Sequence, residues 1–272
     1  MLWQGVQRHL LGKWWSSSSP DYVKRTVMLS ITGSYPSPAM LQRWGRLPPG
    51  PCSLCPRGNL HACTQCHLQT SCGGTKSARI AAHHALRSLL STLVVNTAKG
   101  WVSHPELTLG ATRSLLAENG VHIPELPPFS HLAPGSTTST MVDWSQSSHW
   151  RPDDTLLHLR SRTLVIAEFT RAWDGTADYD DKQDALKGRR YSAWLAHLRL
   201  HLPHGWSAEQ LNFTIGSRGS ILQRRWDRHL DTLRVPLTAR DRVYTLLHHQ
   251  ALSSLYDVFQ AAKAARLKQA TA

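Results

Sequence analysis

Residues 151–191 read RPDDTLLHLRSRTLVIAEFTRAWDGTADYDDKQDALKGRRY, the most informative segment of the chain. The apolar runs at 155–159 and 163–169 predict two adjacent strands joined by a short polar turn. The next segment, 180–202, is typical of a helix and stops before Pro203. Strands followed closely by a long helix predict an α/β protein built around a sheet.

Two acidic side chains stand where these predicted strands meet. Asp153 precedes the first strand, and Glu168 follows 15 positions later, at the end of the apolar run of the second. Because neighbouring strands bring such side chains together, the two carboxylates predict a site for a hard divalent cation such as Mg²⁺. Such an ion polarises a phosphodiester and activates water. The pair therefore predicts a Mg²⁺-dependent phosphodiesterase.

The lysine that would complete such a site is displaced. In the usual PD-(D/E)xK arrangement it lies two residues after the second acid, where this chain has Thr170. Lys187 is the expected replacement, because the predicted helix that carries it would pack across the same sheet, and Lys182 is a second candidate. A lysine there would neutralise charge that develops on phosphorus. Spacing alone leaves open that the acids are ordinary turn and strand-end residues.

The chain carries a large excess of positive charge. Among 272 residues, 31 Lys and Arg outnumber 18 Asp and Glu, which gives a formal net charge of +13. Such a balance favours polyanions through counterion release, so nucleic acid is the expected partner. The side chains predicted to contact nucleic acid are Arg151, Arg171, Arg190 and His83.

All five cysteines lie between positions 52 and 72. Disulfides of a secreted domain would be spread through the fold, so this crowding predicts metal binding in a reducing, intracellular compartment. Two residue pairs are favoured as ligands of a tetrahedral, structural Zn²⁺: Cys52 with Cys55, and His67 with Cys72. Three spare donors leave other ligand sets open: Cys63, Cys66 and His61. Reduced cysteines packed in a small core are a further alternative.

The rest of the chain supplies helices and one more strand. No apolar run reaches the roughly 20 residues of a membrane span, so no membrane partner is expected. Residues 100–150 are rich in Pro, Ser, Gly and Thr and are predicted to be mostly loop. The other expected elements are helices at 21–29, 76–96, 112–118, 221–233 and 239–266, and a strand at 211–215.

Several segments together resemble the C-terminal region of non-LTR retrotransposon polyproteins, which carries a zinc knuckle and a restriction-like endonuclease. The likeness covers roughly residues 25–265, and the order of the pieces is more specific than any single motif. The matching pieces are CSLC at 52–55, HLQTSC at 67–72, ARIAAHHALRSLL at 78–90, RPD at 151–153, VIAEFTRAWD at 165–174 and KGRRY at 187–191.

The resemblance implies a restriction-endonuclease-like core, a mixed sheet flanked by helices, with a small zinc-knuckle appendage. Asp153 and Glu168 would be its metal-binding acids, Lys187 its displaced catalytic lysine and Tyr191 the neighbour of that lysine. Such a nuclease nicks one strand of a DNA target in the nucleus, and the exposed 3′ hydroxyl then primes reverse transcription. Element RNA and an upstream reverse transcriptase domain are the further partners that the resemblance implies.

The chain is expected to divide into three parts: an N-terminal helical and loop segment at 1–50, a CCHC zinc knuckle at 51–74 and a restriction-like endonuclease domain at 75–272. It has no Tyr-x-Asp-Asp polymerase signature, so it is not expected to copy RNA by itself. Two alternatives stay open beside the nuclease. The chain would be a nucleic-acid-binding module with an inert acid pair, or a catalytically decayed retrotransposon fragment.

Overall fold

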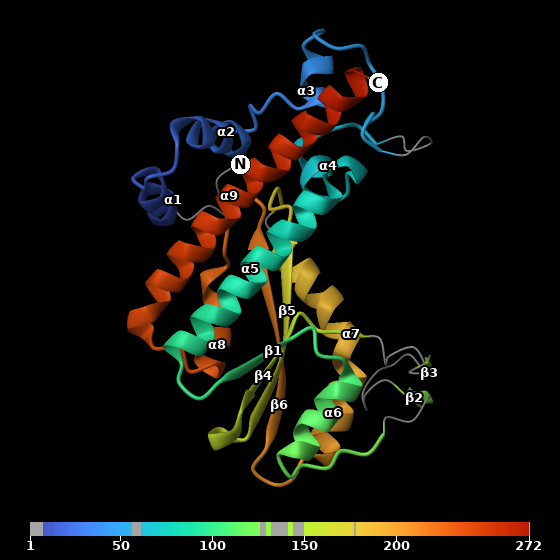
Figure 1. Cartoon of the computed structure of the whole chain (residues 1–272), viewed down its shortest axis with the longest axis vertical. Helices are drawn as coiled ribbons and strands as arrows, with labels where there is room; N and C mark the ends of the chain where they lie inside the picture. Colours follow the sequence, from blue (N-terminus) through green and yellow to red (C-terminus); the bar gives the residue numbers. More distant parts are fainter. Residues whose placement is uncertain are drawn as a thin grey trace.

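The computed structural model describes residues 8–55, 61–125, 129–131, 141–143, 150–176 and 178–271, which form a mixed α/β protein (Figure 1). Its larger sheet has four strands in the order β1-β4-β5-β6. β4 pairs antiparallel with both β1 and β5, whereas β5 and β6 are parallel. The strands are β1 Val102–Pro105, β4 Asp154–His158, β5 Thr163–Ala172 and β6 Ser207–Gly216.

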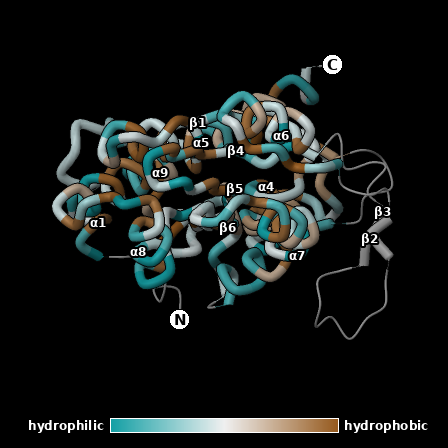
Figure 2. The backbone as a smooth tube through the Cα atoms, turned by 90° about the horizontal axis from the view of Figure 1, so that it is seen from below, coloured by the Kyte–Doolittle hydropathy of each residue, from teal (hydrophilic) through white to brown (hydrophobic). Residues whose placement is uncertain are grey.

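Helices cover both faces of this sheet (Figure 2). α7 (Tyr179–His201) is the crossover that a parallel pair such as β5 and β6 requires. Leu164 and Ile166 of β5 pack against α7, whereas Val165 and Ala167 face α5 (Lys76–Thr97) and α9 (Leu237–Ala270). Because both faces are covered, every residue from Thr163 to Phe169 is buried, and the strand reads as a continuous apolar run.

α5 and α9 lie side by side across one face of the sheet (Figure 1). Leu86 and Val94 of α5 share a buried cluster with Val243 and Leu247 of α9 and with the sheet. α8 (Gln223–Thr232) joins the same cluster through Trp226. The remaining elements are η1 Gly73–Thr75, α6 Leu109–Glu118, β2 Phe129–His131, β3 Met141–Asp143 and η3 Leu159–Ser161.

The N-terminal helices lie along α9, with α1 nearer its start than the others (Figure 1). Trp14, Ile31 and Leu68 form one buried cluster with Leu255 and Phe259 of α9. Three of the cysteines belong to the same cluster, so the cysteine-rich segment packs on the helix that also covers the sheet. The helices of this part are α1 Arg8–Trp15, α2 Asp21–Ile31, α3 Pro38–Arg43 and α4 Gln65–Thr70.

The predicted mixed α/β fold is confirmed, with shifts at the element ends. The strand expected at 155–159 is Asp154–His158, and the one expected at 211–215 extends from Ser207 to Gly216. The prediction that 100–150 is mostly loop missed the strands β1, β2 and β3. β1 gave no signal because it is a short, half-exposed edge strand without apolar alternation. In the same region, 126–128, 132–140 and 144–149 lie outside the described residues. None of the described helices is both long and apolar enough to span a bilayer.

Candidate functional site

Four side chains that were predicted as metal ligands converge at one point. The ligand atoms of Cys52, Cys55, His67 and Cys72, here called the Cys3His cluster, all lie within 4.8 Å of one another. Cys55 Sγ lies 3.2 Å from His67 Nε2, and Cys52 Sγ lies 3.7 Å from Cys72 Sγ. Metal-ligand bonds of tetrahedral zinc imply ligand separations of roughly 3.5–3.8 Å. The cluster could therefore bind a metal ion, and its donors suit zinc.

Local structure points the His67 ring into this cluster. Thr64 caps α4, and its hydroxyl accepts a hydrogen bond from the His67 backbone N–H at 3.1 Å. His67 Nδ1 lies 3.0 Å from Ser71 Oγ, which leaves Nε2 toward the cysteines. A second ring nitrogen held in this way is typical of metal-binding histidines. The Gly73 backbone N–H donates to Cys55 Sγ at 3.4 Å.

Because the cluster is buried, its cysteines do not ionise readily unless a cation is bound. Burial, together with the neighbouring thiols, raises the pKa of Cys52 and of Cys72 to about 12. Burial also lowers the pKa of His67, which favours its neutral form, the form that binds metal. A bound cation would reverse the penalty on the thiolates. The donor set thus fits a zinc ion, and all four zinc ligands would come from protein.

The spare donors lie outside the Cys3His cluster. Cys63 is buried in the apolar cluster under α9, and Cys66 lines a separate cavity with Trp173 and Arg218. The ring of His61 is centred 5.9 Å from that of His67. Among the described residues, the set that converges is therefore the favoured one rather than the four-cysteine alternative.

The two acids meet at the edge of the sheet where β4 begins. Asp154 pairs with Ala167, so one further step of the antiparallel register places Asp153 opposite Glu168. The Phe169 backbone N–H donates to Asp153 Oδ2 at 2.7 Å, which fixes that carboxylate against β5. Asp153 and Glu168 are here called the acid pair. Glu168 is almost fully buried, at 2% exposure, and Asp153 is partly open.

Each member of the acid pair has its own cationic or potentially cationic partner. Lys187 on α7 forms an ion pair with Glu168, and His83 Nε2 on α5 lies 2.9 Å from Asp153 Oδ1. Burial opposes ionisation of Asp153, but His83, the Phe169 N–H and the Lys187 charge together outweigh it and lower the pKa of Asp153. The acid pair is thus held between α5 and α7 by side chains from both.

Tyr191 lies against Glu168, one turn after Lys187 on the same helix. Its ring is fully buried, and its hydroxyl lies beside the Glu168 carboxylate without a hydrogen bond of ordinary geometry. Burial and then the Glu168 carboxylate raise the pKa of the Tyr191 hydroxyl, which is therefore neutral at physiological pH. The structure thus brings Asp153, Glu168, Lys187 and Tyr191 together, and their catalytic roles stay predictions.

The candidate nucleic-acid contacts lie in different settings. Arg151 is exposed, and exposed Arg190 lies over the rings of Trp150 and Tyr191, 6.0 and 5.5 Å from their centroids. Arg171 is partly buried and donates to the Gln69 side chain at 2.6 Å. His83 contacts Asp153, so its role as a phosphate contact stays a prediction. Lys182 pairs with Asp178 on the surface instead of with the acid pair.

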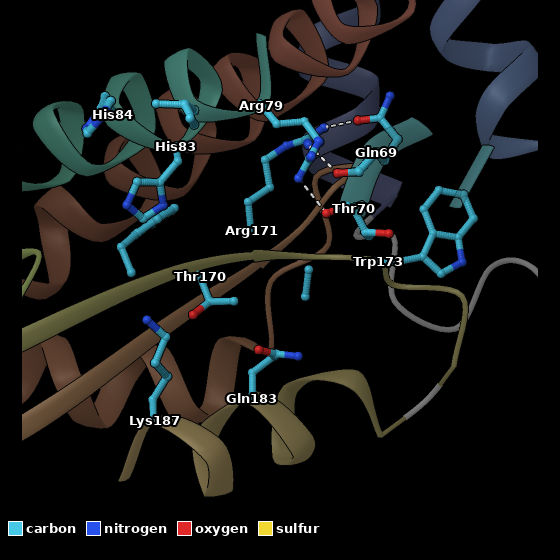
Figure 3. A pocket seen from close by; sticks show the side chains of 13 residues that line it. Gln69, Thr70, Arg79, His83, His84, Thr170, Arg171, Trp173, Gln183 and Lys187 are labelled. Carbon is cyan, nitrogen blue, oxygen red and sulfur yellow. Dashed lines mark hydrogen bonds between the residues drawn. The ribbon is translucent and has the colours of Figure 1, made fainter. Parts of the chain in front are cut away.

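Two features of this region escaped sequence reasoning. Asp154 is almost fully buried, and its Oδ2 accepts hydrogen bonds from Ser91 and, at 2.7 Å, from Ser103. The second acid of RPDD was the only sequence signal for it. A cavity of about 520 Å³ also opens beside Lys187 and His83 (Figure 3). Its walls come from four separate segments, so no local motif could have indicated it.

No known protein-family model matches this sequence, and comparison with curated proteins finds no match. Among the described residues, the Cys3His cluster is the one group of three or more His, Cys, Asp or Glu side chains that could hold a metal. The acid pair has only two such side chains, Asp153 and Glu168, and would supply two protein ligands to a metal ion. Inferences about function therefore depend on the geometry of these two sites and on the chain's charge.

Proposed function

We propose that this protein is a Mg²⁺-dependent DNA endonuclease, with a restriction-endonuclease-like core and a structural zinc ion in the Cys3His cluster. The observation that carries the proposal is the meeting of Asp153, Glu168 and Lys187 at one edge of the sheet. Asp153 lies directly before β4, Glu168 lies in β5 and Lys187 lies in α7. Two acids and a lysine in this arrangement are what metal-dependent phosphodiester hydrolysis requires.

Asp153 and Glu168 would hold the metal ion. Mg²⁺ prefers oxygen ligands and is usually bound by one or two carboxylates, with water and substrate phosphate completing its shell, so two protein ligands suffice. When bound, the ion would polarise the phosphodiester and lower the pKa of water. The remaining roles belong to side chains of the chain itself.

Lys187 would supply positive charge to the phosphate group being cut. Its ammonium forms an ion pair with Glu168, and its charge also acts on Asp153 at longer range. Phosphate charge that develops during hydrolysis would be stabilised there. His83 would orient Asp153 through the contact at Oδ1, and Tyr191 would pack the Glu168 side of the site.

The resemblance to non-LTR retrotransposon endonucleases supports a more specific role. In that role the enzyme would nick a DNA target in the nucleus, and the exposed 3′ hydroxyl would prime reverse transcription. A reverse transcriptase domain and element RNA would be partners in that reaction. The formal net charge of +13 supports a polyanionic substrate, because counterion release favours its binding.

A second candidate is a nucleic-acid-binding module without cleavage. It is favoured by one observation: each acid already has a cationic or potentially cationic partner, Lys187 or His83, and so could serve only to hold the fold. A catalytically decayed retrotransposon fragment would keep the same contacts. The nuclease is preferred because Lys187 and His83, the partners of the two acids, both line an open cavity.

The test is nicking of supercoiled plasmid by zinc-loaded wild type and by Asp153→Asn, with and without Mg²⁺. Asp153→Asn preserves the shape of the side chain but removes the charge that would bind the metal, so nicking should fall to background. Asp178→Asn is the matched control, because Asp178 is an exposed acid paired with Lys182 outside the acid pair.

Nicking that requires Mg²⁺, persists in Asp178→Asn and disappears in Asp153→Asn would support the nuclease. A folded, zinc-loaded wild type that binds the plasmid without nicking it would instead favour the binding module. A folded protein that does neither would favour the decayed fragment.

A further inference from the structure

The cavity beside the acid pair is a groove that leads away from it along β5. In Figure 3, Gln69 and Arg79 lie on one side of the end of β5, and Gln183 and Lys187 lie on the other. The residues of β5 that line the groove begin at Phe169, next to the acid pair, and the lining continues to Trp173, just after the strand. Four residue steps at about 3.3 Å each give a length of about 13 Å, which is longer than a lone phosphate group needs.

Two guanidinium groups, of Arg79 and Arg171, meet in one wall of this groove (Figure 3). They are here called the arginine pair. Arg171 donates to the Gln69 side chain at 2.6 Å, and Arg79 donates to the Cys72 carbonyl at 3.0 Å. Among the described residues, both arginines donate only to neutral oxygens, and neither forms an ion pair with a carboxylate.

The charge of the arginine pair is therefore incompletely compensated. Asp174 is the carboxylate that acts on Arg171 electrostatically, but its Oδ1 is already bound by Arg218 at 2.9 Å. Burial and then the neighbouring Arg79 lower the pKa of Arg171 to about 10, so it stays charged at neutral pH. The Arg171 Nε–H is buried without a partner among the described residues. A phosphate would fit two such forks, because its oxygens accept paired N–H donors.

An aromatic side chain lines the far end of the groove. Trp173 is only partly buried, and the Arg218 guanidinium lies 4.8 Å from its ring centroid. Arg218 belongs to a second cavity, which Trp173 also lines, so the indole is bordered by Arg218 and by the groove. Proteins commonly bind single-stranded nucleic acid with aromatic rings in positively charged grooves, because any unpaired base can stack on such a ring.

We propose that this groove binds an unpaired stretch of nucleic-acid strand, with a phosphate on the arginine pair and a base stacked on Trp173. The inference rests on the proposed function only in taking nucleic acid as the ligand, and it does not require cleavage. Bases in a duplex are already stacked on each other and cannot reach the indole. The groove would then hold a strand unpaired next to the acid pair.

The experiment compares binding of a short fluorescein-labelled oligothymidine with binding of a duplex of equal length, by fluorescence anisotropy. The protein is the full, zinc-loaded chain with Asp153→Asn, without Mg²⁺, so that cleavage does not interfere. The test variants are Trp173→Leu and Arg171→Gln. Their matched controls are Trp44→Leu, an exposed tryptophan after α3, and Arg160→Gln, an exposed arginine at the opposite end of β5.

Trp173→Leu should weaken binding of the single strand by about tenfold, with little effect on the duplex, because one stacked base is lost. Arg171→Gln should also weaken single-strand binding and reduce the slope of log K against log salt by about 0.7, the value for one phosphate contact. Both controls should bind the oligothymidine like the parent.

Single-strand affinity that is unchanged in Trp173→Leu and Arg171→Gln would overturn the inference, as would an equal loss for duplex and single strand in Trp173→Leu. Zinc content and circular dichroism report whether each variant is folded. If Arg171→Gln loses zinc, Trp173→Leu decides by itself. The nicking assay is independent of these results, because a chain that never nicks can still show the selective loss, and an active nuclease can fail to show it.

Discussion

The Cys3His cluster and the acid pair are both sites of converging side chains, but they are built in opposite ways. The cluster draws its four ligands from one short stretch, Cys52 to Cys72, and these side chains have mainly each other as partners. The acid pair joins β4 and β5, and its carboxylates are held by Lys187 from α7 and His83 from α5. One site is formed by a single short segment of the chain, and the other is a product of tertiary packing.

This difference indicates what each site needs. Buried thiols with a pKa near 12 need a cation before they can ionise, so the cluster is incomplete without a metal. The acid pair already has partners from the protein, the Lys187 ammonium and the His83 ring, and can persist without a metal ion. We therefore expect that metal removal affects folding at the cluster, whereas at the acid pair it affects chemistry. Four substitutions would test this contrast.

Cys72→Ser should abolish stoichiometric zinc binding and unfold the cysteine-rich segment. Cys72 is fully buried in the Cys3His cluster, and zinc binding supplies folding free energy on the order of 10 kcal/mol in small zinc domains. Metal analysis and thermal unfolding would measure the loss. Cys66→Ser is the control, because Cys66 lies outside the cluster. If Cys72→Ser kept one tightly bound zinc and the parental melting temperature, the assigned ligand set would be wrong.

Lys187→Met should destabilise the fold by about 3–5 kcal/mol, because it leaves the buried Glu168 carboxylate without its ion-pair partner. Urea unfolding would measure the change. Adding Glu168→Gln should restore most of the stability, since the pair is then replaced by neutral groups, although nicking should stay absent. Equal stability of Lys187→Met and wild type would show that the acid pair does not depend on protein charges.

Ser71→Ala should lower zinc affinity by about 10- to 100-fold while leaving the folded structure intact at saturating zinc. Ser71 Oγ lies 3.0 Å from His67 Nδ1 and helps to orient that ring. Loss of such a partner typically lowers metal affinity by about this factor. Competition with a coloured chelator would give the affinity. The prediction fails if the affinity changes by less than twofold, and Ser53→Ala, also within the cysteine-rich segment, is a control.

Tyr191→Phe should change stability by less than about 1 kcal/mol, because the buried hydroxyl that it removes makes no hydrogen bond of ordinary geometry among the described residues. Chemical unfolding would check this value. A parallel nicking assay then isolates the hydroxyl, since the ring and its packing remain. A loss of several kcal/mol would mean that the hydroxyl is bonded in solution and that it helps to hold Glu168.

Much of the architecture could be predicted from local patterns. The apolar run Leu164–Ala167 indicated a strand covered on both faces, because helices on both sides select apolar residues at every position. The spacing of Cys52, Cys55, His67 and Cys72 indicated one ion, because ligands so close in the chain have few ways to meet. β1 could not be predicted, since its residues are half-exposed and it is held by backbone pairing to β4.

The site was predictable in its residue types more than in its contacts. Asp153, Glu168 and Lys187 were all expected at the site, but the contact of His83 with Asp153 was not, since a histidine on a mixed helix face gives no indication of its partner. The burial of Asp154 and the meeting of Arg79 with Arg171 also had no local signal. These contacts join segments far apart in the sequence.

The mixed α/β class, the convergence of the Cys3His cluster and the candidate acids could thus be predicted, because each depends on local spacing, periodicity or residue chemistry. The ion pair of Lys187 with Glu168, the contact of His83 with Asp153 and the continuation of a cationic groove to Trp173 follow from tertiary packing. They arise because α5 and α7 pack on opposite faces of one sheet. Which side chains they bring to its edge depends on the packing of the whole core.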